Sequence, residues 1–199
     1  MGGELIAELS EVGGKKVEVE PGKKKESIQI NSKEIADPII ADLNVAKYQV
    51  LTVEKKEHTK KANPPFTTST LQQAAANVLG WSGKQTMMIA QQLYEAGLIT
   101  YHRTDSFNLA NEAITSGRVE IEKRYGKEYL PEKPNFYQTK SKNAQEAHEA
   151  IRPTDSTKYG VHSTGSMEEE RQDKLYMLIW RRFMACQMKP AIYDQTWIS

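Results

Sequence analysis

The sequence predicts an α+β fold in which a discontinuous β-rich segment frames an inserted, mainly helical domain. Apolar residues alternate with polar ones near both ends of the chain, which is typical of half-buried strands. Between the ends, helix-capping patterns recur, as in Ser82 with Gln85 and Ser166 with Glu169. We therefore expect strand-rich segments in residues 1–60 and 189–199 and a helical domain in residues 61–188.

The composition is that of an ordinary globular protein. Hydrophobic residues make up 38% and charged residues 27% of 199 positions, and no apolar run is long enough to span a membrane. The single cysteine, Cys186, excludes an internal disulfide and a four-cysteine zinc site. The net charge of +1 neither supports nor excludes nucleic acid as a partner.

The strand-rich N-terminal segment begins with a predicted hairpin. Residues 4–9 and 15–20 alternate in polarity on either side of Gly13-Gly14, which favours an antiparallel pair. A short strand around Ile28 and Ile30, a helix over residues 32–46 and a strand over residues 48–56 follow. Polar residues 57–63, followed by Pro64-Pro65, indicate a boundary.

The central part predicts a pair of adjacent helices with clear start and stop signals. Ser69 with Gln72 and Ser82 with Gln85 form capping boxes, and Gly80 and Gly97 stand where the helices should end. Later helices are expected over residues 109–125 and 166–188, helical turns over residues 145–151, and a last strand over residues 192–198. The expected buried faces consist of Leu71, Ala75, Val78, Leu79, Met88, Ile89, Leu93, Ala96, Ile114, Ile121, Tyr125, Leu175, Leu178, Ile179, Phe183 and Cys186.

A tyrosine segment, residues 97–106, follows the second of these helices. An ordinary phenol has a pKa of about 10 and is a poor nucleophile unless nearby groups favour its ionised form. Side chains alternate in extended chain, so Arg103 lies on the same side as Tyr101 and His102 points the other way. A guanidinium there can hold a phosphate against the phenol. From these residues alone, a strand-end tyrosine followed by an Asp/Ser turn is the favoured interpretation, and a nucleophilic tyrosine stays open beside it.

Four blocks in order extend this observation: residues 65–73, 86–95, 97–108 and 144–153. Together they resemble the type IA DNA topoisomerases, the bacterial topoisomerase I group in particular. The resemblance covers most of residues 63–190 and is looser over residues 1–62. It implies that the strands form an arch carrying a helical tyrosine domain.

The resemblance also implies a chemistry. Tyr101 would attack a backbone phosphorus of single-stranded DNA, leaving a 5′-phosphotyrosyl link and a free 3′-hydroxyl that later reseals the strand without ATP. The whole enzyme would pass a strand through the gap and relax negative supercoils. Arg103 would clamp the phosphate, and His148 matches the family's histidine near the scissile bond. The remaining matches are expected to support the site or bind DNA: Glu95, Thr100, Thr104, Asp105, Ser106 and Arg152.

The resemblance implies a missing half of the active site as well. Type IA enzymes bind Mg²⁺ in a separate acidic domain with an Asp-x-Asp pair, and this chain contains no Asp-x-Asp. We therefore expect no metal site in this chain, with Mg²⁺ held elsewhere in the parent enzyme. Single-stranded DNA and that acidic domain are the expected partners, with no membrane involved. The expected location is the cytoplasm, at the nucleoid, and the chain alone should be inactive.

Other interpretations stay open at this level. The tyrosine segment is shared with reverse gyrase and topoisomerase III, although residues 86–95 and 1–62 favour topoisomerase I. The paired helices also fit a non-catalytic helix-turn-helix DNA-binding module. Against that module, the second helix of the pair has Lys84 as its only basic residue. A non-catalytic hinge that only positions other domains is the structural form of this alternative.

Overall fold

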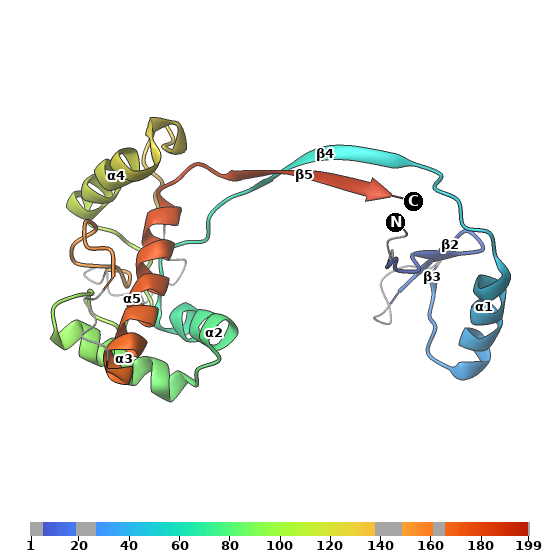
Figure 1. Cartoon of the computed structure of the whole chain (residues 1–199), viewed down its shortest axis with the longest axis horizontal. Helices are drawn as coiled ribbons and strands as arrows, with labels where there is room; N and C mark the ends of the chain where they lie inside the picture. Colours follow the sequence, from blue (N-terminus) through green and yellow to red (C-terminus); the bar gives the residue numbers. More distant parts are fainter. Residues whose placement is uncertain (1–5, 19–26, 138–148, 161–165, 199) are drawn as a thin grey trace. The chain divides into compact units, whose positions relative to one another are not determined.

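A computed structural model describes residues 6–18, 27–137, 149–160 and 166–198 of the chain (Figure 1). The contacts divide the chain into two compact units, residues 1–54 with 197–199 and residues 55–196. The mixture of helices and small sheets confirms the predicted α+β class.

The first unit contains a small sheet and one helix. Strand β1 (Glu11–Val12) pairs antiparallel with β2 (Lys15–Val17), and β2 pairs in parallel with β3 (Ser27–Ile28). The hairpin turns at Gly13 and Gly14 as predicted, with positive φ angles that favour glycine. The first strand was predicted at residues 4–9, but residues 6–9, the described part of that range, are not in a strand, because the tight turn pairs the residues immediately beside it. Helix α1 (Lys33–Val45) confirms the predicted helix.

Two long strands form a separate two-stranded sheet. Strand β4 (Val53–Lys60) pairs with β5 (Ala191–Ile198), and the two lie alongside each other in Figure 1. The C-terminal strand is confirmed. The predicted strand at residues 48–56 is displaced toward the C-terminus, so that residues 57–60, the first part of the predicted boundary at residues 57–63, lie inside β4. Alternating polarity in the sequence predicts which side chains face the same side of a strand. The ends of the strand are instead set by pairing with β5, which is distant in the sequence.

Helices α2 (Thr68–Leu79) and α3 (Gly83–Glu95) form the predicted adjacent pair. Ser82 caps α3 by accepting a hydrogen bond from the Gln85 amide, and α2 ends at Gly80 in the left-handed conformation (φ 71°). The predicted start of α2 at Ser69 is wrong. Thr67, two residues before Ser69, is the N-cap and forms a capping box with Thr70. Because Thr67 and Thr68 already have hydrogen-bond partners, the helix begins before Ser69.

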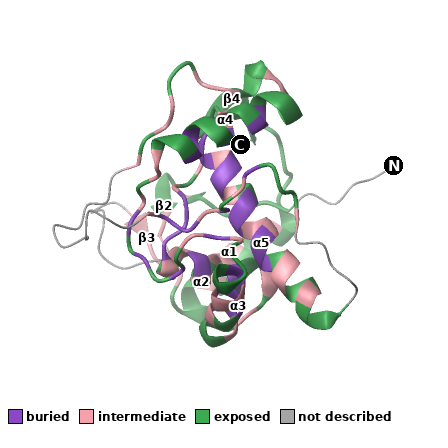
Figure 2. Cartoon of the chain, turned by 90° about the vertical axis from the view of Figure 1, so that its left-hand side faces the viewer, coloured by how far each residue is buried: buried purple, intermediate pink, exposed green. Residues whose placement is uncertain are grey.

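Helix α5 (Met167–Cys186) is the centre of the second unit's core. It contacts α2, α3 and α4 (Asn111–Tyr125), which a short 3₁₀ helix, η1 (Lys127–Tyr129), follows. Ser166 caps α5 as predicted. Buried residues concentrate along α5 in Figure 2. Helices α4 and α5 approach closely at Gly117, where a Cβ atom would lie 3.0 Å from the Phe183 ring.

Some predicted core residues are exposed: Val78, Met88, Ala96 and Tyr125. They lie at the edges of the apolar stripes or at a helix end, where the neighbouring helix does not reach. The other residues of the predicted buried faces are buried or half-buried. The predicted helical turns at residues 145–151 are wrong where they are described, because Ile151 pairs in extended conformation with Phe66.

Candidate active site

Three segments far apart in the sequence meet beside the tyrosine. Phe66 forms an antiparallel bridge with Ile151, and Ile99 forms another with Pro153. All three of the apolar side chains Phe66, Ile99 and Ile151 are fully buried. Residues 65–68, 97–104 and 150–154 are therefore held in register by backbone pairing over a common core.

Thr100 connects the tyrosine segment to residues 150–152. Its backbone amide donates to the Arg152 carbonyl at 2.9 Å, and its Oγ1 donates to the Ala150 carbonyl at 2.7 Å. The Arg152 amide in turn donates to Thr100 Oγ1 at 3.0 Å. The residue before Tyr101 thus has both its backbone and its hydroxyl engaged, which leaves little freedom for the phenol's attachment point.

Thr68 connects the other side of the same segment to the start of α2. Its Oγ1 donates to the His102 carbonyl and accepts from the Thr104 amide, both at 2.9 Å, and its own amide donates to the Thr104 carbonyl. Further along, the Ser106 amide donates to Thr104 Oγ1 at 3.1 Å, and Ser106 Oγ accepts from the Asn108 amide. Thr104 and Ser106 therefore close the turn after the tyrosine.

Burial alternates along the tyrosine segment as the extended conformation predicts. Tyr101 is 45% exposed, and Arg103 and Asp105 are also exposed. His102, Thr104 and Ser106, the intervening residues, are buried. The phenol and the guanidinium therefore face the surface.

Three aromatic rings pack together at the tyrosine. Tyr101 contacts Tyr94 and His102 edge-to-face, each with ring centroids 5.3 Å apart. Tyr94 belongs to α3, so the contact supports the phenol on a rigid helix. The carboxylate of Glu95, next on α3, is exposed and accepts a hydrogen bond from the Gln91 side-chain amide at 2.5 Å.

Arg152 does not present a free guanidinium. Its Nη2 pairs with Glu149 Oε2 at 2.7 Å, and its Nη1 donates to the Pro153 carbonyl at 3.0 Å. Glu149 Oε1 also accepts from the Ala110 amide at 2.6 Å, at the start of α4, where Ala110 itself has no capping side chain. Glu149 therefore both stabilises the first turn of α4 and orients the Arg152 guanidinium.

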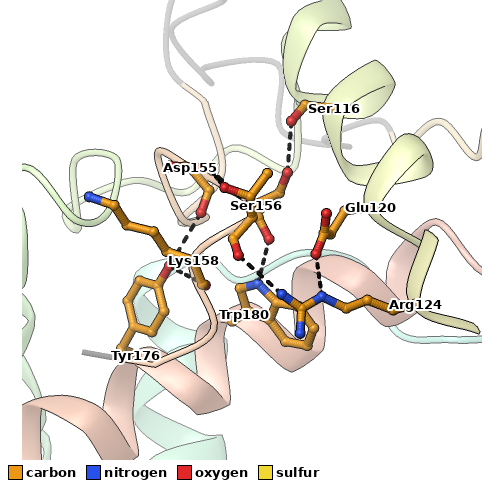
Figure 3. Close-up of polar contacts among 9 residues, drawn as sticks. Ser116, Glu120, Arg124, Asp155, Ser156, Lys158, Tyr176 and Trp180 are labelled. Atoms are coloured by element: carbon orange, nitrogen blue, oxygen red, sulfur yellow. Dashed lines mark hydrogen bonds and ion pairs between the residues drawn. The ribbon is translucent and has the colours of Figure 1, made fainter. Parts of the chain in front are cut away.

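The loop that follows Arg152 is clamped by α4 and α5 (Figure 3). Trp180 Nε1 donates to the Ser156 carbonyl at 2.9 Å, and the Tyr176 hydroxyl donates to the Lys158 carbonyl at 2.9 Å. From α4, Ser116 shares a hydrogen bond with the Ser156 hydroxyl, and Arg124 donates to the Thr157 carbonyl while pairing with Glu120. Burial raises the pKa of Tyr176 to about 12, so its hydroxyl keeps its proton. The clamp fixes the segment that pairs with residues 97–104.

Comparison with known proteins identifies the family to which this chain belongs. A family described as DNA topoisomerase matches residues 4–199. The chain belongs to the DNA topoisomerase family. The likeness to type IA enzymes predicted from the four sequence blocks is thereby confirmed.

Relatives within the topoisomerase family share about half of the residues. DNA topoisomerase 1 of Vibrio cholerae is 56% identical over 80% of this chain and 18% of its own length. DNA topoisomerase 1 of Escherichia coli is 52% identical over 84% of this chain and 19% of its length. That of Rickettsia prowazekii is 49% identical over 96% of this chain and 24% of its length. The chain thus spans a quarter or less of these relatives.

A solved topoisomerase structure has the same fold. The full-length topoisomerase I of Thermotoga maritima superposes with a TM-score of 0.64 and 35% sequence identity, covering 87% of this chain and 28% of that one. Over the described parts of the chain, no helix is both long and apolar enough to cross a membrane.

The candidate site around Tyr101 contains residues that sequence reasoning missed. Thr68, Tyr94 and Glu149 each contact the tyrosine segment or its neighbour, yet nothing in their local sequence distinguishes them from surface residues. Their only signal was membership of the blocks that resemble the family. His148, predicted to lie near the scissile phosphate, falls outside the described residues.

Among residues 6–18, 27–137, 149–160 and 166–198, no group of three carboxylate, histidine or cysteine side chains lies close enough to hold a metal ion. Mg²⁺ prefers several oxygen ligands around one point. The exposed carboxylates of the tyrosine segment and its supporting helix, Asp105 and Glu95, do not make such a set by themselves.

Proposed function

We propose that this chain supplies the nucleophile of a type IA DNA topoisomerase, with Tyr101 as the attacking residue. The phenolic oxygen forms a bond to a backbone phosphorus of single-stranded DNA, and the bond from phosphorus to the 3′-oxygen breaks. The phenol's proton ends on that 3′-oxygen. The DNA is left with a 5′-phosphotyrosyl link and a free 3′-hydroxyl, which reverses the step after strand passage.

The exposed placement of Tyr101 on a rigid support is the observation that carries this proposal. The ring lies on the outer side of a segment whose backbone is hydrogen-bonded to Thr68 on one side and to Arg152 on the other. Transesterification exchanges one phosphate ester for another, so little free energy is lost and no ATP is needed. Accurate placement of the nucleophile is then the main requirement.

The exposed Arg103 provides the second part of the proposed chemistry. Its guanidinium can donate two hydrogen bonds to one phosphate and stabilise charge that develops in the transition state. We propose His148 as a further phosphate or proton contact. Thr100, Thr104 and Ser106 hold the segment, whereas Glu95, Asp105 and Arg152 are proposed supporting residues near the DNA.

The rest of the active site is proposed to lie on an acidic Mg²⁺-binding domain of the same parent protein. Residues 61–188 would form the tyrosine domain, and residues 1–60 and 189–199 the arch; the division of the chain into two units with a discontinuous first unit supports this arrangement. The reported relatives named DNA topoisomerase 1 support that subtype. The parent would relax negative supercoils in the cytoplasm, at the nucleoid, and this chain alone would be inactive.

Complementation in trans tests the proposal. The chain is mixed with the separately purified acidic domain of a relative, Mg²⁺ and single-stranded DNA labelled at its 3′ end, since the 5′-phosphate fragment stays on the protein. We expect labelled protein that survives denaturation. DNA labelled at the 5′ end should instead yield a shortened, protein-free fragment.

Two variants make the result specific. Tyr101→Phe should abolish the adduct, whereas Tyr94→Phe, which keeps the neighbouring ring and removes its hydroxyl, should retain it. An adduct that persists in Tyr101→Phe would assign the nucleophile to another residue. Turnover of supercoiled plasmid by the chain without the acidic domain would contradict the split active site.

A further inference from the structure

His102 is a buried polar side chain whose place in the site is not explained by packing. It is 1% exposed, and neither ring nitrogen, Nδ1 or Nε2, has a hydrogen-bond partner among the described residues. Leaving buried polar atoms unpaired lowers the stability of the fold. An apolar side chain of similar size would fill the same space without that loss, so the imidazole requires another reason.

The imidazole ring forms part of the surface against which Tyr101 rests. The His102 and Tyr101 centroids are 5.3 Å apart with an interplanar angle of 66°, and Tyr94 lies 5.7 Å from His102. The Thr68 hydroxyl holds the His102 backbone carbonyl at 2.9 Å. Within the described part of the chain, His102 is therefore fixed through its backbone, while its ring packs against Tyr94 and Tyr101 without a hydrogen bond.

The charges around His102 favour its neutral form. Burial lowers the pKa of the imidazole below 6.5, the nearby guanidinium of Arg103 lowers it further, and the carboxylate of Glu95 opposes both. The phenols of Tyr94 and Tyr101 are the other titratable groups whose rings pack against the imidazole. Protonation would place a positive charge and two unpaired N–H donors in a buried space beside Arg103.

We propose that His102 is a positioning residue for Tyr101: its neutral imidazole holds the phenol ring in place for attack, and protonation expels the imidazole and releases that ring. The inference depends on the proposed role of Tyr101 as nucleophile. It deepens that role, because it makes placement of the nucleophile sensitive to pH. The rate of DNA cleavage then falls toward acidic pH as His102 becomes protonated, and this decline is the acid limb of the pH profile.

Nuclear magnetic resonance of this chain tests the coupling between the two rings directly. The imidazole carbons of His102 and the ring carbons of Tyr101 are followed from pH 7.5 to 4.5. We expect both sets to move with a shared midpoint below 6.5, the ordinary value for histidine. Tyr101 resonances that stay unchanged through the titration of His102, or a midpoint at or above 6.5, would overturn the proposal.

Substitutions test the effect on chemistry in the complementation assay. His102→Met fills a similar volume and does not titrate, so the acid limb of adduct formation should disappear. His102→Ala removes the support and should slow adduct formation at every pH by roughly two- to tenfold, the range expected for an edge-to-face aromatic contact. His58→Met, at an exposed histidine of β4, is the matched control and should change neither the acid limb nor the rate of adduct formation. An unchanged acid limb in His102→Met would refute the inference.

Failure of this inference and failure of the proposed function give different results. Tyr101→Phe should lose the adduct yet keep the ring contact, so the shared titration should persist in that variant. If the unmodified chain forms no adduct, Tyr101 is not the nucleophile, but the resonance titration still decides whether His102 positions its ring.

Discussion

Thr100 and Arg152 are joined by reciprocal hydrogen bonds: the Thr100 amide donates to the Arg152 carbonyl at 2.9 Å, and the Arg152 amide donates to Thr100 Oγ1 at 3.0 Å. The hydroxyl of Thr100 also donates to the buried Ala150 carbonyl. This one side chain therefore fixes the residue before Tyr101 to a segment about fifty positions later.

Thr100→Val should remove this connection while keeping the shape of the side chain. We expect the free energy of unfolding to fall by about 1–3 kcal/mol, because the Arg152 amide and the Ala150 carbonyl each lose a partner. Urea denaturation, monitored by tryptophan fluorescence, measures this free energy of unfolding. Thr115→Val, at a residue whose exposed hydroxyl donates to the Asn111 carbonyl within α4, is the control and should change stability by less than about 0.5 kcal/mol. Equal effects of the two variants would contradict the cross-link.

Glu149 should prove to be the cap of α4 although it lies outside that helix. Glu149→Ala removes the acceptor for the Ala110 amide and is expected to cost about 1–2 kcal/mol, as for other lost N-caps. Glu149→Gln keeps a side-chain oxygen and should cost less. Hydrogen exchange should quicken at the Ala110 amide in the alanine variant, while Glu122→Ala on the exposed face of α4 leaves it unchanged. Unaltered protection of Ala110 in Glu149→Ala would disprove this role.

Local signals in the sequence predicted most of the helices, whereas the site depends on pairings that local signals do not contain. Ser82 and Gly80 were identified as helix boundaries because capping is decided within one turn. The start of α2 was misplaced because Thr68 is held by residues 34 positions away. The alternation that exposes Tyr101 and buries His102 was predicted, since it follows from extended backbone alone. The unpaired state of the imidazole was not, because it depends on what packs around it.

Cys186 should be unreactive in the folded chain. Burial raises the pKa of its thiol to about 12, opposed by its hydrogen bond with Gln187 and the charge of Arg182. At pH 8.5, a thiol-specific reagent should therefore label the native chain far more slowly than the urea-unfolded chain. The unfolded thiol ionises near pH 9 while the folded one stays protonated, so stability should fall as pH rises from about 9 toward 12. Rapid labelling of the native chain without loss of structure would contradict the burial of Cys186.

Trp180 should couple the helical core to the active-site segment. Its indole Nε1 donates to the Ser156 carbonyl at 2.9 Å (Figure 3). Its ring also packs edge-to-face against Tyr159, with the ring centroids 5.0 Å apart. Trp180→Phe removes the donor and leaves unfilled volume, so we expect a loss of about 1–3 kcal/mol in unfolding free energy. The loop over residues 154–160 should exchange its amide protons faster, because α5 no longer holds Ser156.

The consequence for function separates this clamp from general stability. Loosening residues 154–160 is expected to free the Leu98 carbonyl from the Thr154 amide, which donates to it at 3.0 Å, and so to relax the segment that carries Tyr101. Adduct formation in Trp180→Phe should therefore decline even at temperatures where the variant is fully folded. Trp197→Phe, at a tryptophan that is 57% exposed, is the control and should alter neither stability nor adduct formation. Undiminished adduct formation in folded Trp180→Phe would show that the clamp stabilises the domain without positioning the nucleophile.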